Sequence, residues 1–338
     1  MSGPETPLAP SPGILQSFVR SWPAWLMTII VAVAGAYAFS PRPTVTYAPQ
    51  PIKPDQFLVT GLAQAGGHLV AVGELGHILT ADRVNGPWQE AAIEPDRGST
   101  ITQVAFIGGD VAIAVGHDGW ILRSTDAGHS WKEVAFDKEH ADPLMAVAVA
   151  AGKVYVAGSF GQLRVSADQG QTWERISADA LGDHHLYGLV QQHDGSILIV
   201  GEQGLMVRSA DGGKSWQALP PVYNGSFFGA LATPSGHTIA YGMRGHVFLS
   251  KDYGNHWQAI DLPTHLSLFG GQVLANGDVI LVGENRTVLR SRDGGEHFEL
   301  LQQGDHHSLD AVIATEDGVL LTAGEGGLRS VTAAGGAK

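Results

Sequence analysis

The sequence has no cysteine, and few of its 338 residues carry a positive charge. The absence of cysteine excludes disulfides, a thiol nucleophile, cysteine-held zinc or iron–sulfur sites and a lipidated N-terminal cysteine. Lysine and arginine together number 20, against 33 aspartates and glutamates, which gives a formal net charge of -13. Because proteins that read nucleic acid usually carry a basic footprint, we expect no nucleic-acid partner.

Glycine and tryptophan, in contrast, are abundant, with 45 and 8 copies. The glycines follow no Gly-X-Y period, which excludes a collagen-like chain. Together the two residue types favour many tight turns around packed aromatic side chains, and they argue against disorder.

Residues 22–39 form a run of 18 residues without charge. A helix of that length just spans a hydrocarbon core of about 30 Å. A cleavable signal peptide is the alternative, because Ala36-Tyr37-Ala38 fits a small-x-small cleavage site. The long preceding segment, with its single positive charge, favours an uncleaved transmembrane signal anchor. Both alternatives export the rest of the chain, so we expect residues 1–21 to be a cytoplasmic tail. The protein would then be single-pass in the inner membrane, with its C-terminal part in the periplasm.

Two landmarks then recur at intervals of 41 to 43 residues. The first is a glycine that closes an apolar run, at Gly73, Gly116, Gly158, Gly201, Gly242, Gly283 and Gly324. The second starts a run, at Leu58, Ile101, Leu144, Leu186, Phe227, Leu268 and Leu309. The runs are short, rich in Val, Ile, Leu and Ala, and separated by turn residues, which is typical of strands. Four such strands form one blade, so we predict an all-β fold, a seven-bladed β-propeller over residues 55–330.

A turn motif, S-x-D-x-G-x-x-W, joins the third and fourth strands of most units, and it is known as the Asp box. Its five copies pair Asp126 with Trp131, Asp168 with Trp173, Asp211 with Trp216, Asp252 with Trp257, and Asp293 with Phe298. We expect each aspartate to accept hydrogen bonds from turn amides and each aromatic ring to pack over the hairpin. Thr80, Asp82 and Trp88 form a degraded first copy. Five equivalent aspartates cannot all be one active site, so we assign them a structural role and predict no catalytic residue.

The seventh unit stops at Ser330 before any aromatic residue, so it lacks a fourth strand. In units four to six the box aromatic lies 11 residues before the next apolar landmark, and the same offset before Leu58 gives Tyr47. We therefore predict that residues 45–52, inside a proline-rich spacer of residues 40–54, complete the last blade and close the ring. The alternative is a free, stiff spacer. Residues 331–338 show no pattern and are expected to be a flexible tail.

In a propeller, the loops between blades and the turns between second and third strands lie on one face. The repeat places there Glu74, His117, Asp118, Phe160, Glu202, Gln203, Arg244, Glu284, Asn285, Arg286 and Glu325, with His184, His185, His265, His306 and His307 from the loops. Tyr187, Phe228, Phe269 and Asp310 lie just inside the strands. Aromatic side chains within a polar rim are typical of a partner site, so we interpret this surface as the candidate partner face. The alternative is that its aromatic residues fill the centre of the ring.

The histidine pairs on this face raise the question of a metal site, because two histidines and a carboxylate can hold zinc or iron. Neighbouring residues on a strand point to opposite faces, so His184 and His185 do not easily reach one ion. We predict neither a metal nor a cofactor.

The Asp box is also called the bacterial neuraminidase (BNR) repeat. The seven-bladed array that carries it, over about residues 45–330, resembles the photosystem II assembly and stability factor family. The motifs Leu122-Arg123-Ser124, Val207-Arg208-Ser209 and Leu289-Arg290-Ser291 carry the resemblance. It implies a seven-bladed propeller that acts as a non-catalytic assembly factor for a membrane complex. Related proteins of non-photosynthetic bacteria, with an N-terminal membrane segment, often occur beside exporters of the resistance-nodulation-division class. We therefore expect an exporter of that class as the partner. A photosystem II role in a photosynthetic host is the alternative.

Sialidases also carry Asp boxes, and a glycan-binding protein or glycosidase is the second alternative. Sialidases have six-bladed propellers and a Phe/Tyr-Arg-Ile-Pro motif. This sequence lacks that motif, because Arg175-Ile176 is followed by Ser177. A pair of carboxylates at about 5–10 Å would suffice for another glycosidase, and Glu202, Glu284 and Glu325 are the candidates.

Overall fold

The computed structural model describes residues 14–40, 52–83, 86–315 and 318–332. The chain divides into two units, residues 1–51 and residues 52–338, and each is described by itself.

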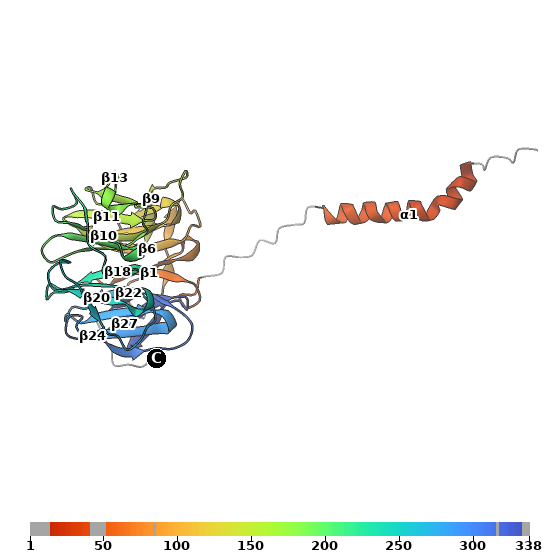
Figure 1. Ribbon diagram of the computed structural model, residues 1–338. Coiled ribbons are helices and arrows are strands. Elements are labelled where there is room, and N and C mark those ends of the chain that lie inside the picture. The colour runs from red at the N-terminus through yellow and green to blue at the C-terminus, as the bar shows by residue number, and fades with distance from the viewer. Residues whose placement is uncertain (1–13, 41–51, 84–85, 316–317, 333–338) are drawn as a thin grey trace, which may run out of the picture. The chain divides into compact units, whose positions relative to one another are not determined.

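In the first unit, Ile14–Ala38 form a single α-helix, α1. It therefore begins inside the segment predicted as a tail and covers nearly all of the predicted span. Pro23 lies inside α1, and a proline there removes a backbone hydrogen bond and bends the helix. Figure 1 shows α1 bent in its N-terminal part. In the described part of the chain, no helix combines the length and the apolar character needed to cross a membrane. The transmembrane span at residues 22–39 stays a prediction.

The second unit is the predicted seven-bladed β-propeller (Figure 1), and its described strands form seven sheets in chain order. The strands of blades 1 to 3 are β1 (Val59–Ala65), β2 (His68–Gly73), β3 (Ile78–Ala81) and β4 (Gln89–Glu90); β6 (Ile101–Gly108), β7 (Val111–Gly116), β8 (Ile121–Ser124) and β9 (Ser130–Ala135); and β10 (Leu144–Ala150), β11 (Lys153–Gly158), β12 (Leu163–Ser166) and β13 (Glu174–Ile176). Strand β5 (Ala92–Glu94) leaves blade 1 and pairs in parallel with β9, so blade 2 gains a fifth strand that the sequence did not predict.

Blades 4 to 7 continue the same order. Their strands are β14 (Leu186–Gln191), β15 (Ile197–Gly201), β16 (Met206–Ser209) and β17 (Gln217–Ala218); β18 (Phe227–Ala232), β19 (Thr238–Gly242), β20 (Val247–Ser250) and β21 (Gln258–Ile260); β22 (Leu268–Val273), β23 (Val279–Gly283), β24 (Thr287–Ser291) and β25 (Glu299–Gln302); and β26 (Leu309–Ala314), β27 (Val319–Gly324) and β28 (Arg329–Thr332). Short 3-10 turns are η1 (Glu74–Gly76), η2 (His117–Gly119), η3 (Asp179–Leu181), η4 (Glu202–Gly204), η5 (Met243–Gly245) and η6 (Glu284–Arg286).

The ring closes where β1 packs against β26. A buried cluster joins Val59 and Leu79 of blade 1 to Leu321 and Leu328 of blade 7, and the Leu328 N–H donates to the Pro54 carbonyl at 2.8 Å. Blade 7 has three strands among the described residues. The predicted closing segment around Tyr47 lies outside the described residues. Strand β28 runs to Thr332, two residues into the predicted tail.

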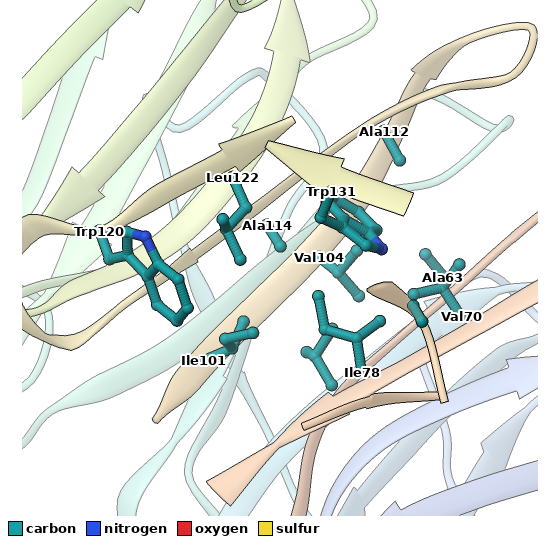
Figure 2. Close-up of a cluster of buried hydrophobic side chains, with 12 residues drawn as sticks. Ala63, Val70, Ile78, Ile101, Val104, Ala112, Ala114, Trp120, Leu122 and Trp131 are labelled. Carbon is teal, nitrogen blue, oxygen red and sulfur yellow. The ribbon is translucent and has the colours of Figure 1, made fainter. Parts of the chain in front are cut away.

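The core lies between neighbouring blades. Figure 2 shows one such cluster, in which Trp120 and Trp131 of blade 2 meet Val70 and Ile78 of blade 1. Both indoles are 1% exposed. Because each blade is covered on both faces, its second strand is buried along its length, as β15 is throughout. This explains why the sequence shows continuous apolar runs instead of alternation.

Each Asp box fastens its hairpin, and the box of blade 2 also touches the preceding blade. There, an Asp126 oxygen accepts from the Ser130 N–H at 2.9 Å, and the Trp131 indole donates to the Gly128 carbonyl at 2.9 Å. Gly128 has φ of 91°, and a Cβ there would lie 2.4 Å from Val70 of blade 1. Glycine is therefore required both for the turn and for the approach of the two blades.

Candidate functional site

A cavity of about 200 Å³ lies at the centre of the ring, lined by the first strand of every blade. The residues that contribute include Leu62, Gln103, Ala146, Tyr187, Phe228, Phe269 and Asp310. Sites for drug-sized ligands hold about 300–1,000 Å³, so this cavity suits one inserted side chain or a small molecule.

A β-bulge near the start of each first strand selects the residues that face this cavity. In blade 4 the pairing shifts between Leu186 and Gly188, which leaves Tyr187 as the extra residue. The equivalent residues are Thr60, Thr102, Met145, Phe228, Phe269 and Asp310. Bulges re-aim side chains, and here those of blades 4 to 7 line the cavity. A Cβ at Gly188 would lie 2.9 Å from the Gly229 Cα of the next blade, so the close approach of the strands requires glycine.

Blades 1 and 2 use the same position differently. The Thr60 hydroxyl donates to the Ile101 carbonyl, and the Thr102 hydroxyl donates to the Leu144 carbonyl at 2.6 Å. Each threonine thus joins its blade to the next one. The lining of the cavity is asymmetric, because Leu62, Gln103 and Ala146 contribute from blades 1 to 3 whereas aromatic rings contribute from blades 4 to 6.

Five rings form a continuous row from the loop face into the cavity, and we call it the aromatic arc: Phe160, His185, Tyr187, Phe228 and Phe269. Successive ring centroids lie 5.0, 6.2, 5.6 and 5.3 Å apart. The outer end is open, since Phe160 is 53% exposed. The Nδ1 atom of His185 is buried without a hydrogen-bond partner among the described residues. The arc combines apolar surface with an unused polar atom.

Asp310 continues the row in blade 7 and lines the same cavity. Burial, and then the nearby Glu325 carboxylate, raise the pKa of Asp310 to about 6. A neighbouring cation would stabilise the ionised form of this buried carboxyl group. Aromatic faces attract cations too. The cavity therefore combines two features that favour a positively charged guest.

The four glutamates of the predicted partner face are engaged within the fold. Glu74 accepts from the Leu58 N–H, Glu202 from His185, Glu284 from Ser267 and Glu325 from Ser308, each at 3.0 Å. In every case the donor begins the blade and the glutamate follows the blade's second strand. These carboxylates hold the segments that connect the blades, so they are poor candidates for a catalytic pair.

Other predicted residues of this face also have partners. The Ser99 hydroxyl donates to Asp118, the Arg244 N–H donates to the Ser267 hydroxyl at 3.1 Å, and Arg286 pairs with Asp305 at 2.6 Å. The pKa of Asp305 is lowered to about 2. The largest cause is the hydrogen bond with the His307 side chain, and the His307 N–H and Arg286 add to it. His117, His265, His306 and His307 are exposed.

The turns of this face share one backbone conformation. Asp118, Phe160, Gln203, Arg244 and Asn285 each have φ between 54° and 58°, at the same place in five successive blades. Three of these side chains, Phe160, Gln203 and Arg244, are exposed, so neighbouring turns of this face present an aromatic, an amide and a basic group.

The two histidine pairs of this face, His184-His185 and His306-His307, can be compared with the possible ligand groups of the described residues. His184 lies 3.7 Å from Glu202, and neither His pair belongs to a group of three possible ligands within the described residues. One such group was not predicted from the sequence: His68, Asp82 and His129. Asp82 belongs to the degraded Asp box. The altered serine position and spacing of that box were the sequence features that could have indicated a different role for Asp82.

A family model described as "Photosynthesis system II assembly factor YCF48" matches residues 80–259, more than half of the chain. No curated protein matches the sequence. YCF48 from Cyanidioschyzon merolae is 15% identical, with a TM-score of 0.66 over 83% of this chain and 97% of that chain. YCF48 bound to a D1 peptide is 18% identical, with a TM-score of 0.67 over 86% and 99%. A streptogramin B lyase is 12% identical, with a TM-score of 0.70 over 82% and 94%. At these identities the structural similarity shows the fold alone.

Proposed function

The chain belongs to the photosynthesis system II assembly factor YCF48 family, and from this premise we propose that it is a non-catalytic factor that binds a segment of a membrane-complex subunit. A propeller of this family has been solved with a D1 peptide, which supports the idea that the architecture receives peptide segments. The family and the fold support an assembly role, and the chemistry of the central cavity supports a more specific partner.

The aromatic arc is the observation that carries this proposal. Rings such as Phe228 and Phe269 offer apolar surface at little conformational cost, and aromatic residues dominate the energetics of many interfaces. Asp310 stands beside them in a cavity large enough for one side chain. We propose that the partner segment inserts a lysine or arginine side chain there, with apolar residues on the outer rings.

A catalytic role has less support. The glutamates that would supply a glycosidase pair each accept a backbone hydrogen bond of their own blade, as Glu202 and Glu284 do. Glycan cleavage would need these carboxylates free to transfer protons.

The partner class that we propose is an exporter of the resistance-nodulation-division class. Its support is the acidic balance of the chain, with 33 acidic against 20 basic residues, and the resemblance to proteins of non-photosynthetic bacteria. A photosystem II subunit is the alternative in a photosynthetic host.

We further propose that residues 22–39 attach the protein to the inner membrane, with the propeller in the periplasm. The apolar side chains of α1 are exposed, including Trp25 at 53% and Ile29 at 57%, and a lipid environment would cover them. Tethering near the bilayer would raise the effective concentration at a membrane partner to about the millimolar range.

The test is co-purification from detergent-solubilised membranes with a C-terminal tag on the full chain. The variants are Phe228→Ala and Phe269→Ala, with Met145→Ala as the matched control at the same bulge position in blade 3. Removal of residues 1–39 tests the anchor separately.

We expect one membrane complex to co-purify with the wild type and with Met145→Ala, and at least about tenfold less with either phenylalanine variant. Equal recovery with all variants would overturn the assignment to the aromatic arc, and recovery of nothing from wild-type membranes would overturn the partner proposal. Circular dichroism establishes that each variant is folded.

A further inference from the structure

A second group of side chains meets at the junction of blades 1 and 2, away from the central cavity. His68 begins β2, Asp82 follows β3, and His129 lies in the Asp box of blade 2. The His68 Nδ1 atom lies 3.0 Å from Asp82 Oδ1, and the His129 Nε2 atom lies 3.9 Å from the same oxygen. One ligand atom from each residue falls within 4.8 Å of the other two.

The degraded box explains why Asp82 faces outward to two histidines. In an intact box, an aspartate oxygen accepts the N–H of the residue four positions on, at 2.9 Å for Asp168 with Thr172. Among the described residues, no backbone N–H donates to the Asp82 carboxylate, which instead contacts His68 and His129. The Asp82 carboxylate thus contacts two other segments, the start of β2 and the Asp box of blade 2.

The donor set and its spacing match a zinc site. Zinc binds histidine nitrogen and carboxylate oxygen at about 2.0–2.2 Å, and tetrahedral geometry then places ligand atoms about 3.3–3.5 Å apart. The two distances from Asp82 Oδ1, 3.0 and 3.9 Å, bracket that value. His68 is half-buried and Asp82 and His129 are exposed, so modest side-chain rotations would bring all three ligand atoms into range.

Access is also available. Asp82 and His129 line a surface pocket of about 350 Å³, which leaves room for water as the fourth ligand. The net charge of -13 favours the approach of cations.

We propose that His68, Asp82 and His129 bind one zinc ion that links blade 1 to blade 2. The three ligands come from both blades, so a bound ion stabilises the junction. Blade 1 combines a two-residue fourth strand, β4, with the degraded box, so a link to blade 2 would stabilise its outer part. The proposal is independent of the partner site.

The experiment uses the full chain in detergent with a tag that lacks histidine. Zinc binding is measured by equilibrium dialysis, and cobalt is added separately because tetrahedral cobalt has a characteristic visible absorption. The variants are His68→Ala, His129→Ala and Asp82→Asn. The matched controls are His256→Ala and His297→Ala. The Nδ1 atoms of these histidines lie 2.6 and 2.7 Å from the box aspartates Asp252 and Asp293. Among the described residues, neither histidine belongs to a group of three possible ligands.

We expect one ion per chain in the wild type and in both controls, and affinity at least about tenfold lower in each of the three variants. Saturating zinc should raise the Tm of the wild type by roughly 2–5 °C and leave that of His129→Ala unchanged. Undetectable zinc binding by the wild type would overturn the proposal. Binding by His68→Ala and His129→Ala that is as tight as that of the wild type would also overturn it.

Discussion

The Glu202 carboxylate accepts a hydrogen bond from the His185 N–H, with 3.0 Å between oxygen and nitrogen. The two residues lie 17 positions apart, at opposite ends of the first hairpin of blade 4. Their bond fixes the segment that enters the blade against the turn after β15. Glu74, Glu284 and Glu325 accept equivalent hydrogen bonds in other blades. Part of the acidic charge of the loop face therefore stabilises the fold.

Replacement of Glu202 by alanine should lower the free energy of unfolding by about 1–2 kcal/mol, because the His185 N–H loses its acceptor. Gln203→Ala, at an exposed position of the same turn, is the control and should change it by less than about 0.5 kcal/mol. Urea unfolding followed by tryptophan fluorescence measures both. Equal effects would contradict the structural role of Glu202.

The box aromatics should contribute unequally. Trp131 is 1% exposed between blades 1 and 2, so Trp131→Ala should cost about 3–5 kcal/mol. Trp257 makes a similar indole hydrogen bond, at 3.2 Å, but is only partly buried. Trp257→Ala should therefore cost less, and a larger loss at Trp257 in urea unfolding would refute this ranking.

Asp310 should make stability depend on pH in one direction. Its pKa is about 6 in the fold, against about 3.9 in an unfolded chain. Between those values the folded chain holds a proton that the unfolded chain has lost, so the free energy of unfolding falls as pH rises from about 4 to 6. Asp310→Asn should stabilise the protein by about 1–3 kcal/mol at pH 7 and much less at pH 4. Urea unfolding at both pH values checks this, and a stabilisation that is the same at both would speak against it.

The Asp boxes should show the opposite dependence. The pKa of Asp211 lies well below its usual range. The hydrogen bond from the Ser215 hydroxyl is the largest cause, and turn N–H groups add to it. A lowered pKa gives stability that is present above the unfolded value of about 4 and is lost as pH falls further. Asp211→Asn should reduce the urea midpoint at pH 7, and its difference from the wild type should shrink below pH 4. Asp82→Asn in metal-free buffer is the control at the degraded copy, and an equally large loss there would contradict the comparison.

The sequence predicted the ring of blades well, because glycines at intervals of 41 to 43 residues report a local requirement in every blade. Gly128 illustrates a related requirement in the box turn, since it needs both a positive φ and room for Val70. The extra strand β5 was missed because three residues after a turn carry no periodic signal.

The sequence could indicate which residues lie on the loop face, but it could not indicate which side chains meet there. The face that contains Phe160 and His185 was identified from loop positions, yet the bulge that directs Tyr187 inward requires the strand register. The Glu202 bond has an offset that recurs in other blades, so it was readable in principle. The meeting of His68 with His129 joins segments of different blades and depends on side-chain direction, which spacing does not give.

The most direct test of partner binding at the aromatic arc replaces Phe228 in the full chain with a photoreactive phenylalanine analogue and irradiates intact cells. Val149, 43% exposed near the far end of β10, is the control position. We expect a covalent adduct to one membrane-complex subunit at position 228 and none at position 149. An adduct at position 149 without one at position 228 would contradict binding at the aromatic arc.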